Sequence, residues 1–135
     1  MITISNPDSV APPVGSYSHL AIVKAGTDLL FVAGQVGMRP DGSVPVDVNE
    51  QYRQSLKNIL AILASEGCGS DDIVKLNTFV VEPLSLESIR EIRLELLGKS
   101  KPPSTLIYVP NLASPEFLVE IEAIAARAAQ KGSPN

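Results

Sequence analysis

Hydrophobic positions repeat with a helical period in two parts of this chain. In residues 48–66, apolar side chains fall on one stripe of a helix, and residues 85–97 repeat the pattern. Gly67 and Gly98 follow these segments, where glycine commonly ends a helix. The residues that can cap the helix starts are Asp47 or Asn49 for the first and Ser85 for the second. The pattern therefore predicts two helices.

Short apolar runs and alternating segments predict six strands around these helices. Residues 18–24 and 29–33 are separated by a short turn and are expected to form a hairpin. The others are residues 2–5, residues 73–81 and two strands within residues 106–126, joined by a short turn. The order β-β-β-α-β-α-β-β predicts a mixed sheet with both helices on one face, in an α/β or α+β layer pair. We expect one domain over residues 1–135.

The last predicted strand carries two glutamates among apolar neighbours. Glu120 and Glu122 are two residues apart and so share one face, whereas Val119, Ile121 and Ala123 share the other. A carboxylate is costly to bury without a partner. The two glutamates are therefore expected to face solvent, a cleft or a subunit interface, which places a candidate acid or base on a rigid strand.

Composition narrows the classes of function. The chain has 135 residues and a net charge of −4, with 44% hydrophobic and 19% charged residues. The acidic balance argues against nucleic acid as a partner, and no apolar stretch approaches the ~20 residues that span a bilayer. No signal peptide is visible, and the single cysteine fits a reducing compartment, so we expect a cytoplasmic protein. One histidine and one cysteine make a poor ligand set for structural zinc, so no metal is predicted.

Several stretches together resemble one known family. They occur in the family's order and at its spacing, over about residues 3–126: residues 15–18, 32–36, 51–63, 72–80 and 119–125. On these residues the chain resembles the YjgF/RidA family of reactive intermediate imine/enamine deaminases, also called the L-PSP endoribonuclease family. The resemblance implies a chorismate-mutase-like α+β fold, with a mixed six-stranded sheet and two helices on one face. It also implies a homotrimer that binds small molecules in clefts between subunits, without a cofactor.

The resemblance carries three site residues over to this chain. Tyr17 matches the loop tyrosine that borders the cleft, and Gly34 matches the glycine whose backbone lines it. Glu120 matches the glutamate thought to hold the attacking water. The competing interpretation of Glu120 is a solvated or interface carboxylate, that of Tyr17 a loop anchor, and that of Gly34 a backbone requirement.

The chain departs from the family at the residue that binds the substrate carboxylate. The family's deaminases carry an arginine there, whose planar fork suits a carboxylate, whereas the register of the last strands places Ser104 at this position. Arg90 lies near a family asparagine and is a candidate replacement cation. His19 stands where the family often has glutamine, and it titrates near neutrality. The competing interpretation of Arg90, and of Arg93 on the same predicted helix, is a solvated helix face, and that of His19 is a hydrogen-bonded surface residue.

Three functions follow from these observations. The first is hydrolysis of a reactive imine or enamine, although Ser104 predicts weak or absent activity on 2-iminobutanoate and 2-iminopropanoate. The second is a related hydrolase, or a non-catalytic trimer that binds a small ligand on the same scaffold. The third, ribonuclease activity, is disfavoured by the acidic charge.

Overall fold

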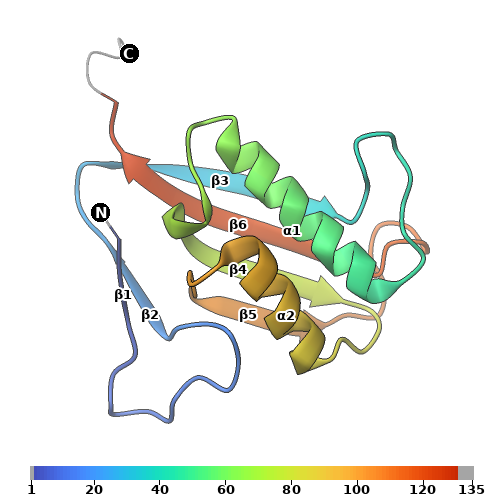
Figure 1. Cartoon of the computed structure of the whole chain (residues 1–135), viewed down its shortest axis with the longest axis horizontal. Helices are drawn as coiled ribbons and strands as arrows, with labels where there is room; N and C mark the ends of the chain where they lie inside the picture. Colours follow the sequence, from blue (N-terminus) through green and yellow to red (C-terminus); the bar gives the residue numbers. More distant parts are fainter. Residues whose placement is uncertain (1, 131–135) are drawn as a thin grey trace.

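The computed structural model describes residues 2–130 and has two helices on one face of a four-stranded sheet (Figure 1). A separate pair of strands lies beside this layer pair. Neither helix is long and apolar enough to cross a membrane, within the residues described. The elements are β1 (Ile2–Ser5), β2 (Leu20–Val23), β3 (Thr27–Val36), α1 (Val48–Ala64), a 3-10 turn (Ser70–Asp72), β4 (Ile73–Val80), α2 (Leu86–Leu97), β5 (Ser104–Tyr108) and β6 (Val119–Ala128).

The helices begin and end where the sequence predicts, to within two residues. The side chain of Asp47 caps α1 by accepting a hydrogen bond from the Glu50 amide, and Ser85 caps α2 in the same way. Gly67 and Gly98 follow the helix ends with φ of 73° and 61°, a backbone region that glycine adopts without steric cost. The predicted stripe of α1 is buried against the sheet, where each large apolar side chain contributes ~1.5–3 kcal/mol of stability.

The four-stranded sheet has the order β3-β6-β4-β5. β6 pairs antiparallel with both β3 and β4, while β5 pairs parallel with β4, so the sheet is mixed as predicted. Val119, Ile121 and Ala123 of β6 are buried on the face that the helices cover. Glu120 and Glu122 are half-buried on the opposite face, called here the outer face. The predicted alternation in β6 is confirmed.

Two predicted strand pairings are wrong. The six strands form two sheets rather than one, because β2 pairs antiparallel with β1 and not with β3. The expected hairpin is therefore absent, although the turn around Gly26 is present. β5 and β6 also do not form a hairpin, since β4 lies between them and residues 109–118 connect them. A local pattern identifies a strand, but the partner is chosen by packing between distant segments.

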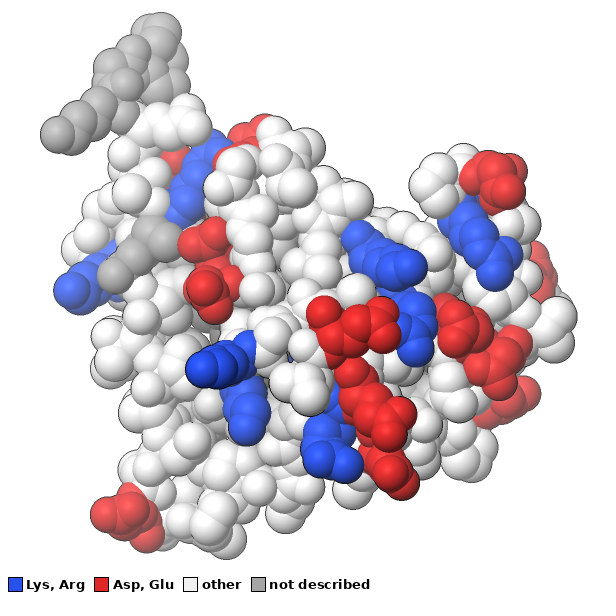
Figure 2. All heavy atoms as spheres, viewed as in Figure 1, with Lys and Arg blue, Asp and Glu red and all other residues white. Residues whose placement is uncertain are grey.

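Charged side chains of both signs are mixed over the helical face (Figure 2). Glu87, Glu91 and Glu95 are all exposed along α2. Arg53 of α1 forms ion pairs with Glu95 and, at 3.5 Å, with Glu50. The face shown carries no broad basic area of the kind that binds a phosphate backbone.

Gln51 of α1 ties the long 109–118 connection to the body of the fold. Its buried side-chain amide donates to the carbonyl oxygens of Pro45 at 2.7 Å and Glu116 at 2.9 Å. Its carbonyl oxygen accepts a hydrogen bond from the Leu118 amide at 2.8 Å. These three bonds fix the chain immediately before β6 and so help to position Glu120.

We expect Gln51→Leu to lower the free energy of unfolding by about 3 kcal/mol, because three backbone groups lose their partner and each unsatisfied buried group costs ~1–3 kcal/mol. Urea denaturation measures the difference. The exposed Lys57 on the same helix provides the control, since Lys57→Gln should change stability by less than ~0.5 kcal/mol. Equal stabilities of the two variants would show that the amide does not hold the connection.

Candidate functional site

A cavity of about 390 Å³ lies between the 14–17 loop, α2 and the sheet edge formed by β5. Ser104 and Tyr17, two of the sequence-predicted site residues, both line it. Tyr52 and Thr78 add hydroxyl groups, and the rest of the wall is largely apolar: Val14, Leu84, Leu86, Ile89 and Leu106. A concave, mostly apolar space with a few polar groups is typical of a small-molecule site.

Arg93, rather than Arg90, is the arginine that reaches Ser104. The Nη2 atom of Arg93 donates a hydrogen bond to Ser104 Oγ at 2.9 Å, and Ser104 Oγ in turn donates to the Pro102 carbonyl oxygen at 2.9 Å. Arg93 is only 6% exposed. Arg90 is exposed and lies outside this cavity, along two neighbouring hollows of the surface. The position that lost the family's arginine therefore still has a guanidinium beside it.

Helical spacing could have identified Arg93 from the sequence. Arg93 follows Ile89 by four residues and precedes Leu97 by four, and both of these are buried, so it falls on the inward stripe of α2. Burial lowers the pKa of Arg93 from its ordinary value, and the neighbouring Tyr52 partly opposes that effect. The sequence-based interpretation placed both arginines on a solvated face, which is wrong for Arg93.

The loop before β2 holds Tyr17 at the cavity and places His19 outside it. The Tyr17 hydroxyl accepts a hydrogen bond from the Val14 amide at 3.4 Å. His19 is exposed, its Nε2 lies 2.7 Å from the Ala11 carbonyl oxygen, and its ring meets Tyr17 edge-on at 6.0 Å. His19 does not line the cavity. The structure gives it contacts typical of a loop anchor.

Glu120 lies on the outer face, directly over Gly34. A Cβ atom added at Gly34 would be 1.9 Å from Glu120 Oε2 and 2.8 Å from its Cδ. Gly34 belongs to an irregularity in the β3–β6 register, between Val32 and Gln35. Such a bulge re-aims the backbone, and here it leaves room for a carboxylate against the main chain. Gly34, which was expected to line a cleft with its backbone, thus lies directly against the Glu120 side chain.

Replacing Gly34 by alanine should displace the Glu120 carboxylate while leaving the fold intact, because the clash falls on the end of a flexible side chain. We expect a small change in melting temperature and a loss of any Glu120-dependent activity. Gly69 offers a matched control, because a Cβ there meets no atom within 4 Å. Full activity in Gly34→Ala would show that the placement of this carboxylate is unimportant.

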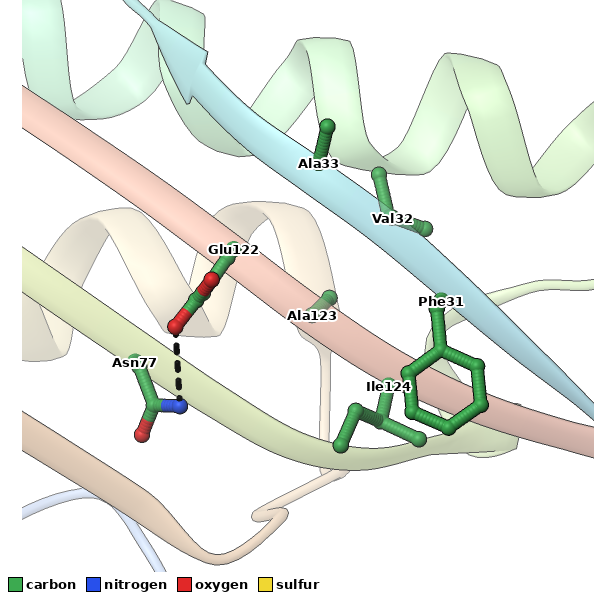
Figure 3. A pocket seen from close by; sticks show the side chains of 7 residues that line it. All are labelled: Phe31, Val32, Ala33, Asn77, Glu122, Ala123 and Ile124. Carbon is green, nitrogen blue, oxygen red and sulfur yellow. Dashed lines mark hydrogen bonds between the residues drawn. The ribbon is translucent and has the colours of Figure 1, made fainter.

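Glu122, two residues further along β6, is held by a neighbouring strand. Its Oε1 accepts a hydrogen bond from Asn77 Nδ2 of β4 at 3.3 Å (Figure 3). Both residues line a second hollow of about 340 Å³ on the outer face, which Phe31 and Ile124 close at one end. Glu122 therefore has a local structural partner, whereas the carboxylate of Glu120 lies against backbone.

The predicted site residues fall on two faces of the sheet. Ser104 pairs in register with Leu76, and Glu120 pairs with Phe79, three residues further along the same strand. Side chains an odd number of residues apart point to opposite faces. Ser104 and Tyr17 thus meet at the cavity near α2, while Glu120 and Gly34 meet on the outer face. Glu120 of one chain does not line the cavity of that same chain.

Comparison with protein families places most of the chain within one of them. The model described as endoribonuclease L-PSP matches residues 8–127. The RutC family protein YjgH of Escherichia coli is 36% identical over 121 residues, which cover 84% of this chain and 90% of the relative. The 2-iminobutanoate/2-iminopropanoate deaminase of Rattus norvegicus is 30% identical over 116 residues, covering 84% and 82%.

Solved structures show the same α+β arrangement. YyfB of the Rid protein family, from Yersinia pestis, superposes with a TM-score of 0.83 at 31% identity and covers 93% of this chain and 98% of its own. TdcF of E. coli with bound serine gives a TM-score of 0.67 at 29% identity, again covering 93% and 98%.

Proposed function

Because this chain belongs to the endoribonuclease L-PSP family, we propose that it hydrolyses the C=N bond of a small imine or enamine. The membership confirms the resemblance drawn from the sequence to the YjgF/RidA family. One relative bears the name of a 2-iminobutanoate/2-iminopropanoate deaminase, which supports the reaction class. The observation that carries the proposal for this chain is the Glu120 carboxylate, set over a glycine on a rigid strand.

Glu120 acts in this proposal as the general base. It accepts a proton from water as the oxygen of that water bonds to the imine carbon. That proton passes to the nitrogen, which gives a carbinolamine. Glu120 then transfers the hydroxyl proton to the nitrogen as the C–N bond breaks, so that ammonia leaves and a carbonyl compound remains. An enamine enters the same route after its tautomerisation to the imine.

The cleft is completed by a neighbouring copy of the chain. The two-faced arrangement supports this part of the proposal, because Glu120 does not line the Ser104 cavity of its own chain. Exposed apolar side chains support such an assembly at both edges of the sheet: Leu29 and Phe31 on β3, and Leu106, Ile107 and Tyr108 on β5. Contact between unlike edges is head-to-tail and forms a ring when the rotation between copies closes. A ring of three is the homotrimer implied by the resemblance.

A non-catalytic trimer that binds a small ligand is the second candidate. The specific observation in its favour is Ser104. This serine stands at the strand position where the family's deaminases carry the arginine on which they rely. Ribonuclease activity has less support, because the chain carries a net charge of −4 and the helical face lacks a broad basic area (Figure 2).

Ammonia release from freshly generated 2-aminoacrylate separates these candidates. We expect release above the uncatalysed rate, but slower than that of the rat deaminase assayed in parallel. The reason is that Ser104 stands where the family's deaminases carry the arginine that binds the substrate carboxylate. Stabilisation by keto acids in a thermal shift assay, with no ammonia release, would instead identify a binding protein and contradict hydrolysis.

A further inference from the structure

Arg93 is a buried charge without a counter-ion. The four ion pairs found among residues 2–130 involve Arg53 and Arg127, and none involves Arg93. The Nε atom of Arg93 is buried and has no hydrogen-bond partner. An uncompensated buried charge is strongly destabilising, so proteins rarely keep one without a reason.

The surroundings of Arg93 leave room for an anion. Among residues 2–130, Arg93 is the only charged residue that lines the cavity of about 390 Å³, and the hydroxyl-bearing residues Ser104, Tyr17 and Thr78 line it too. The hydroxyl groups of Tyr17 and Thr78 can donate to an anion, and the Ser104 hydroxyl can do so once it turns away from the Pro102 carbonyl oxygen. The cavity thus combines a guanidinium, hydroxyl donors and an apolar wall.

We propose that Arg93, assisted by Ser104, binds the carboxylate of a small 2-imino or 2-keto acid, so that α2 supplies the cation that β5 lacks. The identity of the acid rests on the proposed function, whereas the presence of an anion site does not. A guanidinium suits a carboxylate because its planar fork donates two hydrogen bonds in matching geometry.

A carboxylate fits this cavity better than a phosphate group. A phosphate carries up to two charges and three acceptor oxygens, whereas a single arginine faces the cavity. The apolar residues Leu84, Leu86 and Ile89 suit a short hydrocarbon tail attached to the acid. The expected ligands are therefore monocarboxylates with a small apolar side chain.

Isothermal titration with 2-oxobutanoate, an unreactive keto acid, tests the anion site without any turnover. Arg93→Gln should weaken its binding by at least ~10-fold, since charge-assisted hydrogen bonds contribute ~1.5–3 kcal/mol each. Arg93→Lys should weaken it as well, because an ammonium lacks the fork. Arg90→Gln, on the same helix but outside the cavity, should bind as the wild type does. Equal binding of 2-butanone or inorganic phosphate by the wild type would overturn the proposal.

Melting temperatures without ligand distinguish a binding arginine from a structural one. Arg93→Gln removes an uncompensated charge, so its melting temperature should equal or exceed that of the wild type. Ser104→Asp should raise the melting temperature and abolish binding, because it sets a carboxylate of the chain itself against Arg93. A lower melting temperature in both variants would mean that Arg93 serves the fold, and would overturn the proposal.

The outcomes separate this inference from the proposed reaction. Binding of 2-oxobutanoate that depends on Arg93, without ammonia release from 2-aminoacrylate, supports the anion site and contradicts hydrolysis. Ammonia release that depends on Glu120, together with binding unaffected by Arg93→Gln, supports hydrolysis and overturns the anion site.

Discussion

Replacing Glu120 by glutamine should remove most of the ammonia release, by about 100-fold or more, because a positioned general base contributes ~10²–10⁴-fold. Glutamine keeps the shape of the side chain but cannot accept the proton of the attacking water. The fold and assembly should be unchanged, since the side chain lies half-buried on the outer face and takes part in none of the four ion pairs among residues 2–130. Steady-state rates with 2-aminoacrylate and a melting curve measure both properties.

Glu122→Gln is the matched control on the same face of the same strand. Its carboxylate is held by Asn77 at 3.3 Å, and a glutamine can accept the same hydrogen bond through its carbonyl oxygen. We therefore expect turnover close to that of the wild type. If the two variants lost activity equally, or if Glu120→Gln lost none, Glu120 would not be the base.

Phe31→Glu should convert the assembly into monomers and abolish turnover. Phe31 is 73% exposed in the single chain and lies beside Ile124 on the outer face (Figure 3). Burying an unpaired carboxylate at an interface costs several kcal/mol, and a closed ring repeats that cost at each contact. Light scattering measures the mass of the assembly. The ammonia assay measures turnover, which should be lost if each site needs two copies of the chain.

The control for this variant lies on the opposite side of the molecule. Leu94 of α2 is 66% exposed on the helical side, so Leu94→Glu should leave the mass and the activity as they are. A wild-type protein that is monomeric at micromolar concentration, yet fully active, would contradict the proposed assembly.

The sequence predicted the helices and the positions of most strands, but not which strands pair. The stripe of α1 and the alternation of β6 depend only on local spacing, which is why both predictions are confirmed. The partner of β2 depends on how the chain packs after the first loop. β4 lies between β5 and β6 because α2 carries the chain back to a parallel pairing, and no local pattern contains that information.

The candidate site was predicted in part. The resemblance named Tyr17 and Ser104, which line one cavity, and Gly34 and Glu120, which meet on the outer face. Arg93 was missed because a charged residue on a helix usually faces solvent, although its spacing from Ile89 and Leu97 indicated burial. These two pairs of residues lie on opposite faces of the sheet. Their placement depends on the register between strands, which the sequence alone did not predict.

Mixed trimers test most directly whether each site combines Glu120 of one copy with the Ser104 cavity of the next. Glu120→Gln and Ser104→Asp would be co-expressed with different tags, and trimers that contain both would be purified. Each variant alone should be inactive. In a ring of three that contains both variants, one site in three combines two unmodified halves, whichever variant is present twice, so we predict roughly a third of the wild-type activity. Mixed trimers with no recovered activity would contradict a site shared between copies.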